Sequence, residues 1–261
     1  MYSCHRAPRI AILMYHSIRN STETRLHPYY KTVTTPARFA QQMQWIAESG
    51  AEVVALENWN APQTAGGMLR VIITFDDGFA DFMAAAFPVL RTHGYCATMF
   101  LPTAFIDTGK VLVAQQEHLS WEDVAQLRAE GIRFGSHTVN HLHLERLTRE
   151  EIFDEVQTSA QTIHKHGGAP VTSFSCPFAF PQAHPATRAA LRTSLVQCGY
   201  TTGVTTRIGT VSLHDDPYTL KRLPINTDDD KRLFMAKLYG EYNWVNGLQR
   251  AVRLSKRIVH G

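Results

Sequence analysis

Short apolar runs recur along the chain, and most of them are continuous rather than alternating with polar residues. Such runs are typical of strands that are covered on both faces, as in a parallel sheet. The runs that we predict to be strands are IAILMY (10–15), EVVAL (52–56), VIITF (71–75), ATMFL (97–101), IRFGS (132–136), TSFSC (172–176), YTTGV (200–204) and LKRLPI (220–225). The pattern therefore favours a sheet that is buried on both sides.

Helix-forming segments separate many of these runs, and their ends carry start and stop signals. One predicted helix has Pro36 near its start and stops at Gly50. Another begins after Ser120, and a third begins after Thr148, with Glu151 at the spacing of a capping box. Strands that alternate with helices predict a parallel α/β fold.

The length of 261 residues is close to the ~250 residues of a (β/α) barrel. We predict one domain over residues 1–261, a distorted (β/α) barrel of seven or eight parallel strands. The polar connections 19–35 and 57–69 are predicted to be long loops over this barrel. The segment 246–259 is basic and amphipathic, and we expect a helix that packs on the barrel, with peripheral contact to an anionic membrane as the alternative.

Composition excludes several classes of protein. The chain has 26 Lys and Arg residues against 23 Asp and Glu residues, an imbalance too small to predict a nucleic-acid partner. The four cysteines show no C-x-x-C spacing, so we expect reduced thiols. No run approaches the ~20 apolar residues of a membrane span, and the first residues lack a signal-peptide pattern. These features predict a cytoplasmic protein.

Ionisable residues follow several of the predicted strands. The first strand is followed by His16, the third by Asp76 and Asp77, the fifth by His137, and the sixth ends before Pro177. In a parallel barrel the active site lies at the carboxyl ends of the strands. An Asp-Asp-Gly sequence is also good turn chemistry on its own, but histidines and carboxylates gathered at one rim indicate a functional site.

The spacing of His137 and His141 adds to this indication. Residues four apart lie on one side of a helical turn, so we predict such a turn directly after the strand. Two imidazoles and one carboxylate oxygen can hold a zinc ion and leave a position open for water. Of the adjacent carboxylates Asp76 and Asp77, one would bind the cation and the other would stay free to accept a proton.

At this point the motifs match a known family. TFDDGF (74–79) and SHTVNH (136–141) resemble the first two motifs of the polysaccharide deacetylases, metal-dependent carbohydrate esterases with a NodB-homology domain. The resemblance extends over nearly the whole chain. The segment LMYHSI (13–18) is similar to the branch that includes the poly-N-acetylglucosamine deacetylases.

The resemblance implies a role for each residue of these motifs. Asp77, His137 and His141 would be the metal ligands, and Asp76 would be the general base. His16 would be the general acid, as the MYH segment implies for this branch. A divalent metal is implied as cofactor, with zinc expected and cobalt or nickel as alternatives.

Two other residues are weaker candidates for this site. His214, in VSLHDD, is a second candidate for the general acid, although a solvated loop histidine is the favoured alternative. Arg222, in the last predicted strand, would pair with Asp76 and help to hold substrate, although a surface ion pair is the favoured alternative.

The third motif departs from the family. Relatives commonly have a Tyr-Pro-x-Gly turn, whereas this chain has Cys176 in the tyrosine position and Ala179 in the glycine position. In the family this segment lines the pocket, and a backbone N–H there binds the developing oxyanion. Pro177 and Phe178 are the residues that would form this wall. Because alanine resists positive φ, the turn conformation at Ala179 is in question.

The predicted function is metal-dependent hydrolysis of N-acetyl groups on an amino sugar or oligosaccharide. Two alternatives stay open on the same barrel. The first is hydrolysis of a cyclic imide, a ureide or a formyl group. The second is a barrel that binds metal and glycan without turnover.

Overall fold

The computed structural model describes residues 9–20, 31–62, 69–112 and 116–245. The predicted C-terminal helix 246–259 lies outside the described residues, as do parts of the predicted loops 19–35 and 57–69. No helix of the described residues is long and apolar enough to cross a membrane.

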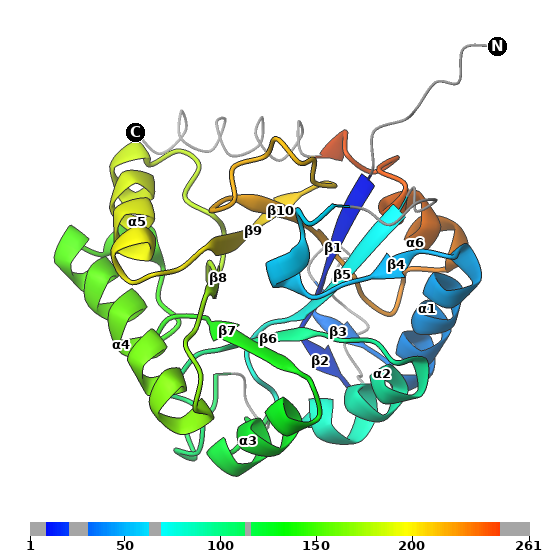
Figure 1. Cartoon of the computed structure of the whole chain (residues 1–261), viewed down its shortest axis with the longest axis horizontal. Coiled ribbons are helices and arrows are strands. Elements are labelled where there is room, and N and C mark those ends of the chain that lie inside the picture. Colours follow the sequence, from blue (N-terminus) through cyan, green and yellow to red (C-terminus); the bar gives the residue numbers. More distant parts are fainter. Residues whose placement is uncertain (1–8, 21–30, 63–68, 113–115, 246–261) are drawn as a thin grey trace.

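Parallel strands surround the centre of the molecule (Figure 1). The sheet has eight strands in the order β1-β10-β9-β8-β7-β6-β5-β4, and a second pairing of β1 with β5 closes all of them except β4 into a seven-stranded barrel. The barrel strands are β1 (Arg9–Tyr15), β5 (Leu69–Phe75), β6 (Thr98–Leu101), β7 (Arg133–Ser136), β8 (Ser173–Ser175), β9 (Thr202–Ile208) and β10 (Leu220–Pro224). The predicted parallel barrel is confirmed.

Strand β4 (Glu52–Val53) lies outside this ring, and it is shorter than the predicted run 52–56. It pairs with the first half of β5, whereas β6 pairs with the second half of β5. A 3-10 helix, Leu56–Asn58, follows it and ends the strand. A separate two-stranded sheet joins β2 (Ser17–Ile18) to β3 (Val33–Thr34), which falls within the predicted loop 19–35.

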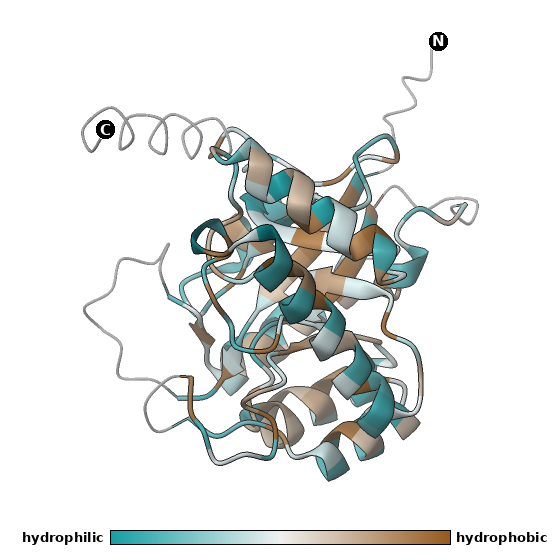
Figure 2. Ribbon diagram, turned by 90° about the vertical axis from the view of Figure 1, so that its left-hand side faces the viewer, coloured by the Kyte–Doolittle hydropathy of each residue, from teal (hydrophilic) through white to brown (hydrophobic). Residues whose placement is uncertain are grey.

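Helices surround the barrel on its outside (Figure 1). They are α1 (Pro36–Ser49), α2 (Phe87–His93), α3 (Trp121–Ala129), α4 (Arg149–Gly167), α5 (Pro185–Gln197) and α6 (Lys231–Leu238), with short turns of 3-10 or π-helix at Leu144–Arg146 and Phe82–Ala86. The three helix starts expected from the sequence are confirmed, since Ser120 and Thr148 both form capping boxes and Pro36 opens α1. In Figure 2 the helices are banded brown and teal, because one side of each packs on the strands.

Alternation along the strands divides the apolar residues into two cores. Ile12, Ile72 and Phe100 belong to a cluster inside the barrel, whereas their sequence neighbours pack outward against the helices. Because side chains of a strand alternate between its two faces, the inward series of β5 runs from Ile72 through Thr74 to Asp76. The barrel interior therefore changes from apolar to polar at its carboxyl end.

Candidate metal centre

The strand β5 delivers two carboxylates to the carboxyl end of the barrel. The backbone N–H of Asp76 donates to the carbonyl oxygen of Tyr15 at 2.9 Å, which extends the β1–β5 pairing by one residue. Asp77 then leaves the strand with φ of 72° and Gly78 follows with φ of 64°. A residue with a Cβ at Gly78 would be strained by this φ, and its Cβ would lie 2.9 Å from Leu101 Cδ2, so that side chain would have to move.

Asp77, His137 and His141 come together at this rim. Asp77 Oδ1 lies 3.4 Å from His137 Nε2 and 3.3 Å from His141 Nε2. The three possible ligand atoms all lie within 4.8 Å of one another, and Asp77 and His137 are buried. These three residues can hold a metal ion.

Hydrogen bonding around the cluster fits a cation. His137 Nδ1 lies 2.8 Å from the carbonyl oxygen of Ser175, so this nitrogen carries the proton and donates it. The lone pair of Nε2 is then directed at Asp77 Oδ1, a buried oxygen with no hydrogen-bond partner among the described residues. Two acceptor atoms that face each other, with the imidazole oriented by a hydrogen bond from its other nitrogen, are typical of metal ligands.

Both carboxyl groups are held in their ionised form. Burial raises the pKa of Asp77, but the facing imidazoles of His137 and His141 outweigh this effect and hold the pKa well below its usual value. Burial also raises the pKa of Asp76, but the positive charge of Arg222 outweighs it and lowers the pKa. The rim therefore carries two carboxylates, of which only Asp77 belongs to the ligand cluster.

Asp76 is fixed by a buried arginine. Arg222, on β10, donates to both oxygens of Asp76 in a bidentate pair with N–O distances of 2.7 Å. Its guanidinium also donates to Ser175 Oγ, Thr74 Oγ1 and the carbonyl oxygen of Thr205. Arg222 is 0% exposed, so the surface ion pair favoured from the sequence is wrong. This geometry orients Asp76 and offers no guanidinium N–H to substrate.

The histidine segment is not the helical turn predicted from its spacing. Thr138 has φ of 66° and His141 has φ of 52°, values that no α-helix contains. Instead, Thr138 Oγ1 accepts a hydrogen bond from the His141 N–H at 3.0 Å. The two imidazoles converge because this tight turn reverses the chain between them.

A carboxylate that the sequence analysis missed holds this turn. Glu155 Oε2 accepts from the N–H groups of Val139 and Asn140 at 2.8 and 2.9 Å, and Oε1 accepts from Asn140 Nδ2 at 2.6 Å. Glu155 is nearly buried on the face of α4 that also carries Ile152 and Val156. A lone acidic residue within a helix's apolar stripe is the sequence signal that would have identified it.

Glu155→Gln is expected to weaken the metal site. Glutamine removes the negative charge and keeps one acceptor oxygen, so its NH₂ faces either the two backbone N–H groups or Asn140 Nδ2 and the hydrogen bonds on that side are lost. Loss of such a supporting group typically lowers metal affinity by about 10–100-fold. Competition with a chromogenic chelator would measure the zinc affinity. Glu150→Gln, on the exposed first turn of the same helix, is the matched control, and equal affinities of the two variants would contradict this role.

Comparison of the amino-acid sequence with known proteins shows the family to which the chain belongs. Residues 66–203, more than half of the chain, match the sequence model of the polysaccharide deacetylases. This chain belongs to the polysaccharide deacetylase family. Members of this family are hydrolytic enzymes.

Two relatives illustrate the range of the match. The Bacillus subtilis protein YxkH, which carries a polysaccharide deacetylase name, is 29% identical over 227 residues, covering 84% of this chain and 72% of that protein. The poly-beta-1,6-N-acetyl-D-glucosamine N-deacetylase of Escherichia coli K12 is 27% identical over 123 residues. That second match covers 42% of this chain and only 18% of the relative.

Solved structures share the fold. The Streptococcus pyogenes deacetylase PplD superposes with a TM-score of 0.74 at 22% identity, covering 89% of this chain and 99% of PplD. IcaB from Ammonifex degensii superposes with a TM-score of 0.71 at 20% identity, covering 89% of this chain and 98% of IcaB. The barrel of this chain therefore has the same fold as these two deacetylases, which it covers almost completely.

The two histidines proposed as general acid lie at opposite ends of this deacetylase barrel. His16 follows β1 directly, and an interaction with its imidazole is one of the causes that lower the pKa of both Asp76 and Asp77. His214 is exposed in the connection between β9 and β10. That connection pairs through Val211 with Ile10 at the amino end of β1, so it has already returned to the other rim. His214 therefore cannot serve this site.

The third-motif segment forms a wall over one of the histidines. The Phe178 ring lies 4.5 Å from the His141 ring and stacks on His143 at 3.8 Å. Phe178 has φ of 52°, whereas Ala179 is not among the residues with positive φ. The left-handed residue of the turn is thus one position earlier than the sequence comparison indicated, and the alanine causes no strain there. Pro177 is buried beneath this wall.

His118 is a further imidazole near the cluster that the sequence analysis did not single out. The Leu119 N–H donates to the carbonyl oxygen of Gly78, so this segment runs beside the turn that carries Asp77. The His118 ring lies between Phe79 and Phe105, with centroid distances of 5.2 and 5.5 Å. Burial there lowers the pKa of His118, which favours its neutral form.

Proposed function

We propose that this protein removes N-acetyl groups from an amino-sugar-containing glycan or glycan precursor by hydrolysis. Asp77, His137 and His141 would hold a divalent metal, with zinc expected and cobalt or nickel as alternatives. The observation that carries the proposal is the pair formed by Arg222 and Asp76, which places an ionised carboxylate outside the ligand cluster but directly beside it. A simple metal-binding site has no need of such a group.

The chemistry that a divalent cation supplies at ligands of this kind is acidification of water and polarisation of an acyl oxygen. Asp76 would accept the proton of the attacking water, because its carboxylate is ionised and held in place by Arg222. His16 would donate a proton to the departing amide nitrogen. The amide C–N bond breaks, and the products are acetate and a free amino sugar.

Phe178 and Pro177 would shape the acyl pocket. Proline has no backbone N–H, so Pro177 contributes only an apolar surface. The N–H of Phe178 would be the donor to a developing oxyanion, an interaction of the ~2.7–4 kcal/mol class. The ring of Phe178 would close the pocket above His141.

A second candidate is hydrolysis of a related amide, such as a cyclic imide, a ureide or a formyl group. The observation that favours it is the altered third motif, in which Cys176 and Ala179 replace the family's tyrosine and glycine. A change in the third-motif segment alters the shape of the acyl pocket and therefore which acyl group fits into it. Binding of metal and glycan without turnover is disfavoured, because a pure binder does not need the Asp76–Arg222 pair.

Metal removal is expected to abolish acetate release, and zinc is expected to restore it. The measurement is acetate released from a panel of N-acetylated sugars, oligosaccharides and nucleotide sugars, with imide, ureide and formyl substrates in parallel. A chelated sample and a sample reloaded with zinc, cobalt or nickel complete the series. Release from an imide or formyl substrate alone would favour the second candidate, and silence of metal-loaded protein across the panel would contradict both.

A further inference from the structure

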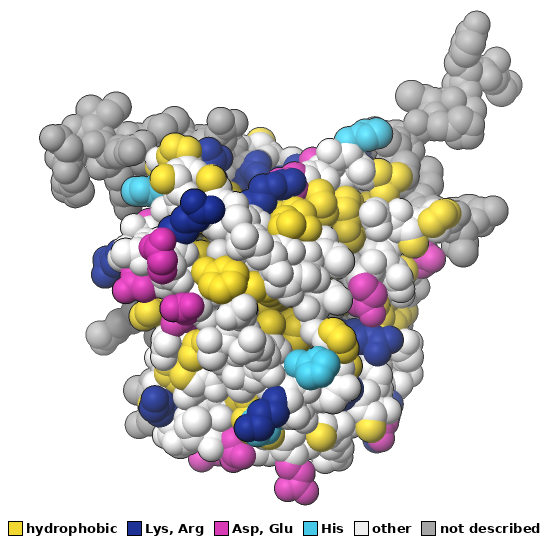
Figure 3. Space-filling view, turned by 60° about the vertical axis from the view of Figure 1, so that its left-hand side comes forward, with side chains coloured by type: hydrophobic (Ala, Val, Ile, Leu, Met, Phe, Trp, Pro, Cys, Tyr) yellow, Lys and Arg dark blue, Asp and Glu magenta, His cyan; other side chains and the backbone are white. Residues whose placement is uncertain are grey.

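A pocket with a volume of about 320 Å³ lies on the outer wall of the barrel. Its lining comes from α5, from the loop that leads into α5, from β9 and from the turn before β10. No helix of the described residues lies between β9 and β10, so this part of the wall stays uncovered. Figure 3 brings this side forward and shows several Lys and Arg side chains gathered in its upper part.

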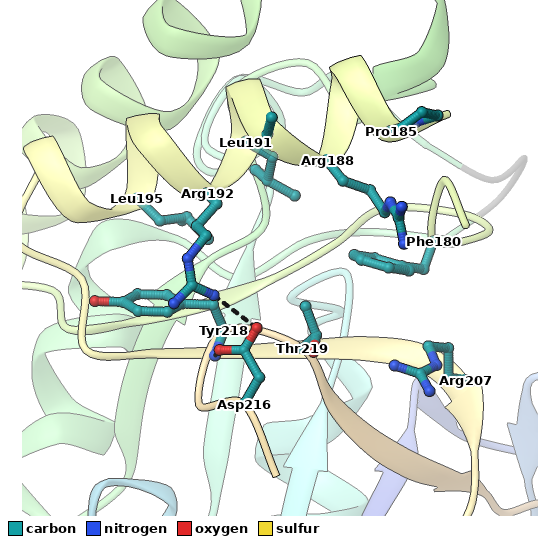
Figure 4. A pocket seen from close by; sticks show the side chains of 11 residues that line it. Phe180, Pro185, Arg188, Leu191, Arg192, Leu195, Arg207, Asp216, Tyr218 and Thr219 are labelled. Atoms are coloured by element: carbon teal, nitrogen blue, oxygen red, sulfur yellow. Dashed lines mark hydrogen bonds and ion pairs between the residues drawn. The ribbon is translucent and has the colours of Figure 1, made fainter. Parts of the chain in front are cut away.

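The pocket is cationic over an aromatic floor. Arg188, Arg192 and Arg207 face a single carboxylate, Asp216. That carboxylate already accepts from Arg192 at 2.6 Å, and the Arg192 guanidinium lies 4.9 Å over the ring of Tyr218 (Figure 4). Positive charge therefore exceeds negative charge in the pocket.

Arg188 is the clearest uncommitted cation. It extends from α5 toward Phe180, while Arg207 enters from the facing wall (Figure 4). Arg188 is exposed, and no carboxylate of the described residues lies within ion-pair distance of it. A guanidinium presents parallel N–H groups that match the two oxygens of a carboxylate or a phosphate.

The pocket adjoins the metal centre through one short segment. Phe178 covers His141, and two residues later Phe180 lines the pocket. Two residues span at most about 7 Å of chain. The N–H of Phe180 donates to Thr206 Oγ1 at 3.1 Å, which fixes this segment beside Arg207. The Phe180 end of the pocket therefore lies at the same rim as the metal centre, whereas Asp216 and Tyr218 line the end that belongs to the connection before β10. A glycan that extends from the metal centre would enter the pocket at its Phe180 end.

We propose that this pocket is an anion subsite that binds a carboxylate or phosphate group of the same glycan whose acetamido group lies at the metal centre. The statement that the acetamido group lies at the metal centre rests on the proposed function. The anion subsite adds that the substrate is an acidic glycan. A neutral sugar makes no use of the Arg188 guanidinium, whereas the rings of Phe180 and Tyr218 suit the apolar face of a sugar that carries the charge.

The test compares the affinities of three probes for zinc-loaded protein by calorimetry. A hyaluronan hexasaccharide carries carboxylates, UDP-N-acetylglucosamine carries a diphosphate, and chitohexaose is neutral. We expect at least one anionic probe to bind on the order of tenfold more tightly than chitohexaose, and the difference to shrink at high salt. The probe that is preferred tells whether the anion is a carboxylate or a phosphate.

Charge variants of Arg188 make the test specific. Arg188→Glu should bring the ratio of anionic to neutral affinity close to one, and Arg188→Lys should keep part of the preference. Arg91→Glu makes the same change at an exposed arginine on α2, so it is the matched control and should keep all of the preference. Equal affinities for all probes, or a preference that survives Arg188→Glu, would overturn the subsite.

Acetate measured in the same samples separates the two proposals. An anionic preference that depends on Arg188, without acetate release from any probe, supports the subsite and contradicts the deacetylase function. Acetate release from chitohexaose with no anionic preference supports the function and overturns the subsite.

Discussion

Asp76→Asn is expected to lower kcat by about 10²–10⁴-fold while the protein keeps its metal. Asparagine cannot accept the proton of the attacking water, whereas the ligand cluster of Asp77, His137 and His141 is unchanged. The measurement is kcat of the zinc-loaded variant together with its zinc content by atomic absorption.

Asp107→Asn provides the matched control. It makes the same change from carboxylate to amide at an exposed residue with φ of 57°, a conformation that asparagine tolerates well. The variants should be compared well below their melting temperatures, because Asp76→Asn also weakens the pair with Arg222. A kcat for Asp76→Asn within about threefold of the parent, far below the range expected for a general base, would remove Asp76 from that role.

The sequence was sufficient for the barrel and for the identity of the clustered residues. Continuous apolar runs mark the strands, and the side chains at their carboxyl ends converge wherever parallel strands close into a ring. His137 and His141 could therefore be grouped with the Asp76–Asp77 pair before their distances were known, and the family resemblance selected Asp77 as the third member. The grouping depended on strand order and not on the local conformation between the histidines.

The local conformation between the histidines could not be predicted from spacing. A separation of four residues fits a helical turn, but Thr138 and His141 adopt left-handed conformations that Glu155 and the Thr138 hydroxyl stabilise. Glu155 lies on the following helix, so its contact with the turn appears only when α4 packs against β7. Spacing correctly indicated that the two histidines lie together and gave the wrong path between them.

The burial of Arg222 also could not be predicted from the neighbouring sequence. Its partner Asp76 is 146 residues away, and the two meet because β10 and β5 both border β1 in the closed ring. His214 is the solvated loop histidine that the sequence favoured, since the connection after β9 returns to the amino end of the barrel. Barrel closure decides both positions.

Backbone strain gathers where the chemistry is proposed. Among the described residues, five non-glycine residues have positive φ, and four of them belong to the metal centre or its wall: Asp77, Thr138, His141 and Phe178. Residues held in such conformations cost free energy and persist only where the surroundings fix them. The hydrogen bonds of Glu155 and the packing of Phe178 on two histidines are the surroundings that do so here. The rest of the barrel must supply the stability that this rim lacks.

Arg222→Met is expected to lower the free energy of unfolding by about 3–5 kcal/mol, the range found when one partner of a buried ion pair is removed. Asp76 would keep a buried charge without its bidentate donor, and Ser175 Oγ would lose the donor that Arg222 provides. Urea denaturation of the zinc-free protein measures the change and keeps metal binding out of the comparison.

The double variant Arg222→Met with Asp76→Asn decides whether the pair or the volume of the arginine matters. If the uncompensated charge is the cause, the double variant should be more stable than Arg222→Met alone, because it buries no charge. If lost packing is the cause, the two destabilisations should add. Recovery of stability without recovery of acetate release would mean that the pair is kept for chemistry, since the barrel would then fold at least as well without an ionised carboxylate at its rim.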